Sequence, residues 1–118
     1  LKGNYEQWIK FFLEAVYESA KDAVETIDKL TSLHDNYCLK IKGLGRRAKN
    51  AMRVFEYLES NPIIEIQKTS KELNMAVNTV SSVVKDLCAI SVLEQTSTQS
   101  RNRTFAYKEY LEILKEGT

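Results

Sequence analysis

The sequence has few residues that interrupt regular structure: of 118 residues, only one is proline and four are glycine. Neither type occurs between Gly3 and Gly43, so nothing in this stretch breaks a helix. No apolar run approaches the roughly 20 residues of a membrane span, and no signal-peptide pattern opens the chain. The two cysteines, Cys38 and Cys88, are far apart and form no Cys-x-x-Cys pair, which argues against a metal site and thioredoxin-type chemistry. We expect reduced thiols in a cytoplasmic protein.

A strong excess of one charge is also absent, because 17 Lys and Arg residues oppose 16 Asp and Glu residues, for a net charge of +1. The charge is unevenly divided. Residues 1–42 hold six basic and seven acidic residues (net −1), whereas residues 43–118 hold eleven and nine (net +2). With 43% hydrophobic and 28% charged residues, the composition is that of a globular protein. The length suits one domain, or one small domain with an additional helical piece, able to fold without a metal or disulfide.

Apolar residues in the first 42 positions recur at helical spacing. We expect two helices, Tyr5–Tyr17 and Ala20–Lys42, with Ser19 as the N-cap of the second; one uninterrupted helix is the alternative. Gly43-Leu44-Gly45 then ends the pattern. This divides the chain into a helical arm, residues 1–44, and a second region, residues 45–118. A heptad-like seam in the arm consists of Ala23, Ile27, Leu30, His34, Tyr37 and Ile41.

The second region has the element order of a winged helix-turn-helix domain. Asn74 lies where the chain must turn between two helices, and asparagine tolerates the left-handed conformation that such a turn requires. The sequence therefore predicts a mainly α (α+β) fold, in which a helical arm is followed by a winged helix-turn-helix domain with a small β-hairpin wing. The expected elements are a helix over Arg46–Glu59, a strand over Ile63–Ile66, helices over Thr69–Leu73 and Val77–Ala89, strands over Val92–Thr96 and Arg103–Tyr107 around a polar turn over Ser97–Asn102, and a helix over Glu109–Glu116.

The helix over Val77–Ala89 has one apolar face, which we expect to pack on the core, and one polar face that can meet phosphates or base edges. Basic residues occur at the tip of the predicted hairpin, where a wing touches DNA, and just after the arm. The alternative is that all these residues form an ordinary solvated surface. Winged helices also bind proteins, so the fold alone does not establish DNA binding. The candidate DNA-binding residues are Val77, Asn78, Ser81, Ser82, Lys85, Arg101, Asn102, Arg103, Arg46, Arg47 and Lys49.

Several segments carry a resemblance that covers nearly the whole chain. They include Trp8-Ile9-Lys10-Phe11-Phe12-Leu13-Glu14-Ala15-Val16, Lys21-Asp22-Ala23-Val24-Glu25-Thr26, Asn61-Pro62, the helix-turn-helix segment, Arg101-Asn102-Arg103-Thr104-Phe105-Ala106-Tyr107 and Glu109-Tyr110-Leu111-Glu112-Ile113-Leu114. Together they resemble the C-terminal region of bacterial Fic-family proteins (filamentation induced by cyclic AMP). The resemblance implies that a helical Fic core precedes a winged helix, and that the aromatic residues near the start of the arm cover that core.

Fic enzymes transfer AMP from ATP to a hydroxyl with a loop of the form His-Pro-Phe-x-x-Gly-Asn-Gly-Arg, and this chain lacks that loop. Its single histidine, His34, is followed by neither proline nor glycine. We therefore expect no catalytic residue, no metal ligand and no cofactor in this chain, with ATP and a divalent cation required only by the absent core. The resemblance then implies a C-terminal fragment of an adenylyltransferase, and the opening Leu1-Lys2-Gly3, without an initiator methionine, fits one.

Three functions are compatible with these observations. The first is a DNA-binding or regulatory module attached to a Fic adenylyltransferase. The second is a protein-interaction or dimerisation module that binds no DNA, and the third is a stand-alone transcription regulator that dimerises through the Ala20–Lys42 seam. The corresponding partners are double-stranded DNA, the parent Fic core and a second copy of the chain, with no membrane.

Overall fold

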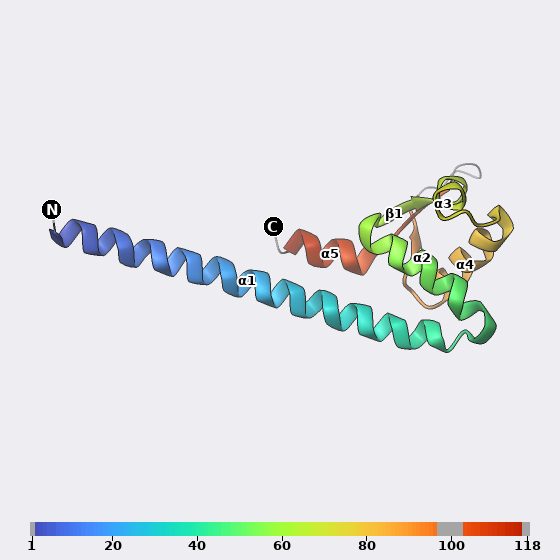
Figure 1. The fold of residues 1–118 in the computed structure, drawn as a ribbon, viewed down its shortest axis with the longest axis horizontal. Helices are drawn as coiled ribbons and strands as arrows, with labels where there is room; N and C mark the ends of the chain where they lie inside the picture. The colour runs from blue at the N-terminus through green and yellow to red at the C-terminus, as the bar shows by residue number, and fades with distance from the viewer. Residues whose placement is uncertain (1, 97–102, 117–118) are drawn as a thin grey trace.

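The computed structural model of the chain describes residues 2–96 and 103–116, with side chains from residue 5 onward. The first element, α1 (Lys2–Lys42), is a single helix of 41 residues. It extends well beyond the rest of the chain, which folds around its C-terminal end (Figure 1), and gives the molecule an extent of 69 × 30 × 24 Å. The prediction of two helices with a break near Ser19 is therefore wrong. Without proline or glycine in this stretch, every backbone N–H after the first turn can bond within the helix, and the helix continues.

The second region is a winged helix-turn-helix, and the predicted fold class is correct. Among the described residues, three strands form an antiparallel sheet in the order β1-β3-β2, with Phe105 of the central strand opposite Ile64 on one side and Gln95 on the other. The elements after α1 are a 3-10 turn η1 (Gly45–Arg47), α2 (Ala48–Ser60), β1 (Ile63–Glu65), α3 (Ile66–Leu73), α4 (Val77–Ala89), β2 (Glu94–Gln95), β3 (Thr104–Ala106) and α5 (Lys108–Glu116).

The strands are shorter than the sequence predicts. Val92 and Leu93, expected at the start of a strand, instead donate their backbone N–H groups to the carbonyl of Leu87 at the end of α4, so β2 begins only at Glu94. Ile66, expected to end the first strand, begins α3 and packs against the core from there. The N–H of Tyr107 bonds to the carbonyl of Pro62 at 2.8 Å, which ties the end of β3 to the segment before β1.

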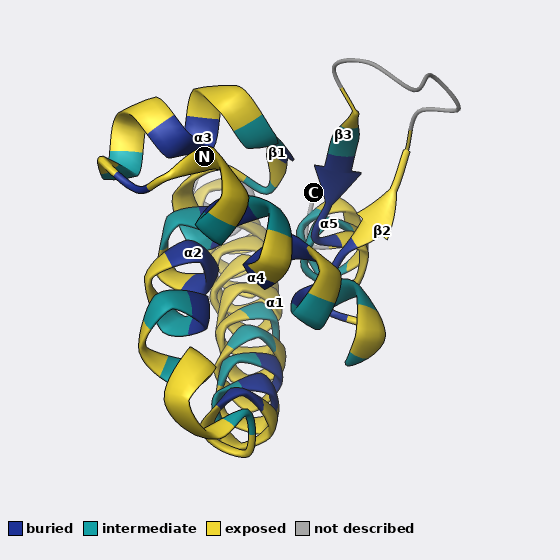
Figure 2. Ribbon diagram, turned by 90° about the vertical axis from the view of Figure 1, so that its right-hand side faces the viewer, coloured by how far each residue is buried: buried dark blue, intermediate teal, exposed yellow. Residues whose placement is uncertain are grey.

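The core lies where α2, α4 and the C-terminal end of α1 meet the sheet, as the buried residues in Figure 2 show. Four residues of α4 anchor this helix, as expected from their spacing, whereas α1 contributes only residues near its C-terminal end. An aromatic cluster joins the layers: the ring of Phe55 lies 5.6 Å from that of Tyr107, which lies 5.1 Å from that of Tyr110. The main core residues are Leu33, Tyr37, Ile41, Val54, Phe55, Leu58, Val80, Val83, Val84, Leu87, Phe105 and Tyr107.

The turn between α3 and α4 depends on Asn74, which has φ 53° and ψ 46°, in the left-handed region. The predicted role of this residue is confirmed. Its N–H bonds back to the carbonyls of Ser70 and Lys71, as at many helix C-termini. Ala76 then precedes α4 in an extended conformation, so three residues connect the two helices.

Candidate nucleic-acid interface

The polar face of α4 forms the centre of the candidate interface. Asn78, Ser82 and Lys85 are exposed and Ser81 is half-buried, while Val77 is 47% exposed at the start of the helix. Residues 81, 82 and 85 follow residue 78 by three, four and seven positions, so the four residues share one side of the helix. The opposite side is fixed in the core. The structure therefore brings the predicted α4 residues onto one solvent-facing surface of donors, acceptors and one cation.

The basic residues after the arm lie at the start of α2. Arg46 and Arg47 belong to η1 and Lys49 to the first turn of α2, and all three are exposed. The Nη1 atom of Arg47 lies 2.9 Å from Oδ1 of Asp86, whose side chain is only 14% exposed. This ion pair joins the start of α2 to α4 and occupies part of the Arg47 guanidinium. Arg47 thus contributes less free charge to the candidate interface than the sequence suggests.

Of the wing, the structure describes the base, where β2 and β3 pair. Thr96 donates its N–H to the carbonyl of Thr104 at 2.9 Å, and the two threonine hydroxyls lie 2.6 Å apart. These contacts and the β2–β3 pairing confirm the predicted hairpin at this end. Arg103 is exposed just before β3, whereas the predicted tip residues Arg101 and Asn102 lie outside the described residues.

Two contacts from α2 to the helix-turn-helix are not apparent from the sequence. The Nη2 atom of Arg53 donates to the backbone carbonyl of Leu73 at 2.7 Å, and the hydroxyl of Tyr57 donates to the carboxylate of Glu72. Burial and this hydrogen bond raise the pKa of Tyr57 to about 12. A bond to a backbone carbonyl 20 residues away leaves no residue pattern, so no signal in the sequence could have revealed it.

The histidine and cysteines hold structural positions. His34 lies between α1 and α2, with Nδ1 2.8 Å from Oε1 of Glu59, Nε2 3.3 Å from Sγ of Cys38 and its ring 5.4 Å from that of Phe55. Burial, followed by the charges of Glu59 and Asp35, raises the pKa of the Cys38 thiol, and burial raises that of Cys88. Within residues 2–96 and 103–116, no group of three or more His, Cys, Asp and Glu side chains is arranged to hold a metal ion.

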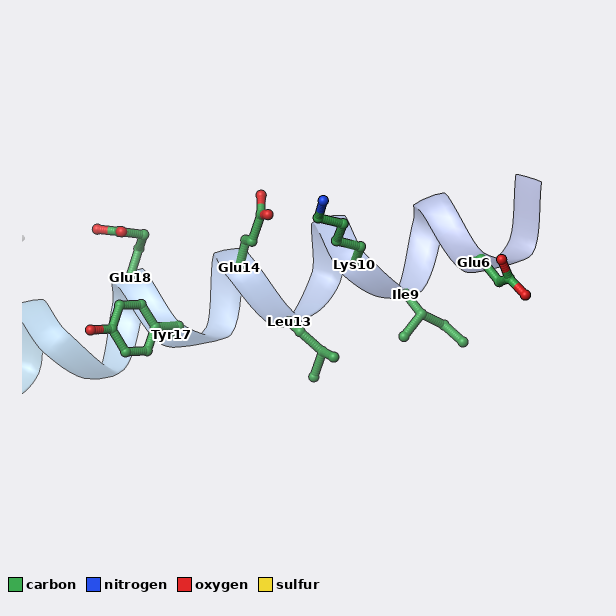
Figure 3. Close-up of a pocket in the computed structure, with 7 residues that line it drawn as sticks. All are labelled: Glu6, Ile9, Lys10, Leu13, Glu14, Tyr17 and Glu18. Atoms are coloured by element: carbon green, nitrogen blue, oxygen red, sulfur yellow. The ribbon is translucent and has the colours of Figure 1, made fainter. Parts of the chain in front are cut away.

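The first half of α1 presents a second unusual surface. Trp8, Phe11 and Phe12 are 61%, 71% and 52% exposed, and the rings of Trp8 and Phe12 stack at 5.6 Å. Figure 3 shows a groove along this half, lined by side chains of α1 alone, so it is a strip of helix surface without a second wall in the described chain. None of the helices described is both long and apolar enough to cross a membrane.

No family model and no curated protein matches this chain. Among solved structures, a transcriptional regulator homologue from Pyrococcus horikoshii OT3 aligns with 75% of this chain and 92% of its own, at 15% sequence identity and a TM-score of 0.44. At this identity and TM-score, the likeness indicates neither a shared function nor a shared ligand.

Proposed function

We propose that this chain is the DNA-binding, regulatory winged-helix module of a Fic-type protein of the bacterial cytoplasm. The observation that carries the DNA-binding part is the face of α4: its polar residues Asn78, Ser82 and Lys85 are exposed while its other face is fixed in the core. In helix-turn-helix domains, the residues near the start of the second helix reach base edges in the major groove. The resemblance to Fic proteins supports the assignment of a parent, whose ATP and divalent cation would bind to the upstream core.

Each part of the interface would make a different kind of contact. The amide of Asn78 can pair with a base edge, and the hydroxyls of Ser81 and Ser82 can bond to bases or phosphates. The ammonium of Lys85 and the guanidinium of Arg103 would each contact a phosphate of the DNA backbone. The modest basic excess of residues 43–118 fits a low-affinity module better than a dedicated repressor.

A salt titration tests DNA binding. We expect the chain to bind random duplex DNA with a micromolar Kd at low salt, measured by fluorescence anisotropy, and the affinity to fall as salt rises because counterions are released. Lys85→Ala should weaken binding and reduce the magnitude of the salt slope by about 0.9.

Arg101→Ala plus Arg103→Ala should reduce the slope by the same amount for each phosphate that the two arginines bind. The exposed Lys10 of the arm provides a charge-matched control, Lys10→Ala, that should leave both quantities unchanged. Absence of binding at low salt would refute the DNA-binding function.

We further infer that the start of α1 is covered by the helical core of the parent protein. Apolar side chains between Tyr5 and Tyr17 surround about 240° of the helix at roughly 100° per residue, far more than the stripe of one packed face. One neighbouring helix would cover only part of so wide an arc, so full coverage requires contacts from more than one side. A helical Fic-type core can supply such contacts, and it would precede α1 directly. The coding sequence upstream of Leu1 tests this inference: a His-Pro-Phe-x-x-Gly-Asn-Gly-Arg motif there would support it, and an unrelated sequence would exclude it.

A second copy of the chain is the alternative partner, favoured by one observation. Ile9, Leu13, Val16, Ala20, Ala23 and Ile27 continue the heptad seam of α1 toward the N-terminus. Sedimentation equilibrium distinguishes the two partners: a monomer at micromolar concentration fits coverage by a parent core, whereas a dimer abolished by Leu13→Glu would favour the dimerisation module.

A further inference from the structure

The turn that leads into α4 is held from outside the helix-turn-helix itself. Arg53 and Tyr57 lie one helical turn apart on α2, and both reach the C-terminal end of α3. Arg53 donates to the carbonyl of Leu73 at 2.7 Å, and Tyr57 donates to Glu72. The last residues of α3 are thus attached to α2 by two side chains.

These bonds act where the path of the chain is decided. The final carbonyls of a helix have no partners within it, and Arg53 supplies a charged donor to that of Leu73, the last residue of α3. The next residue, Asn74, is left-handed; Met75 is buried, and its carbonyl accepts a bond from the hydroxyl of Ser70. Because α4 begins two residues after Met75, at Val77, and its buried face is held by the core, the turn determines where the first exposed residues of α4, Val77 and Asn78, lie.

Arg53 itself is exposed, so burial adds little to the strength of its hydrogen bond to Leu73. It makes no ion pair among the described residues. A basic residue near a candidate DNA interface would ordinarily be assigned to phosphate binding. The geometry supports a different role, since the guanidinium already points at a carbonyl of the turn.

We propose that Arg53 is a positioning residue, which fixes the turn before α4 and thereby the position of the first exposed residues of α4, which would meet DNA. This inference rests on the proposed DNA-binding function. It distinguishes Arg53 from Lys85, which would contact phosphate directly, and assigns the placement of the start of α4 to a residue of α2.

The first test compares affinity with salt slope. Arg53→Ala should weaken duplex binding by about tenfold with an unchanged salt slope, because the same phosphates remain bound. Arg53→Lys retains a donor that can reach the carbonyl of Leu73 and should recover most of the affinity, whereas Lys85→Ala should lower affinity and slope together. Unchanged affinity in Arg53→Ala, or a slope reduced by about 0.9, would overturn the positioning role.

The second test requires no DNA. The N–H of Met75 bonds to the carbonyl of Ser70 at 3.0 Å, and that of Asn74 to the carbonyl of Lys71 at 3.4 Å. In Arg53→Ala these two amides should exchange with solvent at least several-fold faster, whereas the amide of the buried Val84 should be unaffected; Arg53→Lys should restore slow exchange. Unchanged exchange at the turn would refute the positioning role even if the wild-type chain binds DNA. If the wild type binds no DNA, the proposed function fails, and exchange still decides whether Arg53 fixes the turn.

Discussion

A single residue, Asn74, determines the backbone geometry of the turn in the helix-turn-helix. Asn74 adopts a backbone conformation that costs most L-residues about 1–2 kcal/mol. Its side chain is exposed, so its conformation and not its packing determines which residues are tolerated at this position.

Substitutions at Asn74 should therefore follow the rules of the left-handed region. Asn74→Gly is expected to be close to neutral, and Asn74→Ala to lower the free energy of unfolding by about 1 kcal/mol. Urea denaturation measures both. At the exposed position Glu56 in α2, the order should reverse, with Glu56→Ala more stable than Glu56→Gly by about 1 kcal/mol. Equal stability of the two Asn74 variants would contradict the left-handed assignment.

Tyrosine ionisation should make the fold sensitive to alkaline pH. Burial and the hydrogen bond to Glu72 raise the pKa of Tyr57 to about 12, and burial, reinforced by Glu109, also raises that of Tyr37. An unfolded tyrosine ionises near pH 10, so above this pH the unfolded state binds fewer protons than the folded state. The contribution of the protonated tyrosines to the free energy of unfolding is thus complete below about pH 10 and is lost as the pH rises toward about 12. Urea midpoints measured between about pH 8 and 11.5 should fall, and the fall should be smaller in Tyr57→Phe.

At the level of elements, α4 was predicted with its observed bounds, Val77–Ala89, because a turn residue precedes it and valines recur on one face. The candidate residues of α4 could be identified for the same reason. The ion pair of Arg47 with Asp86 and the bond of Arg53 to the turn could not, since they depend on how separate helices pack. The late start of β2 has a local cause instead: the N–H groups of Val92 and Leu93 bond to the carbonyl of Leu87 at the C-terminal end of α4.

The continuity of α1 can be tested at Ser19, the residue expected to cap a second helix. An N-cap serine stabilises a helix, and its replacement by alanine typically costs about 1 kcal/mol. In the interior of α1, where the structure places Ser19, alanine is instead the better helix former by roughly half a kcal/mol. Ser19→Ala should therefore raise the helical signal in far-ultraviolet circular dichroism. A decrease would indicate a break in the helix at this position.

The molecule as a whole combines a packed domain with an arm that mostly contacts solvent. Leu33, Tyr37 and Ile41 join the core, and the hydroxyl of Tyr37 donates to the carboxylate of Glu109 at 2.6 Å. The arm before residue 29 contributes no buried side chain among those described. The stability of the domain should therefore depend on the C-terminal end of α1 and not on the apolar surface further along it.

Deletion of residues 1–28 separates these two parts. We expect the shortened chain to retain the urea midpoint and DNA affinity of the full chain, since the buried contacts of α1 begin at Leu33. It should lose binding of the dye ANS, which reports exposed apolar surface. In the full chain, Leu33→Ala should have the opposite effect, with a loss of about 2–5 kcal/mol of stability and ANS binding retained by the arm. A substantial drop in the urea midpoint after the deletion would show that the first part of α1 stabilises the domain, and would place its apolar surface in the fold instead of at an interface with a partner.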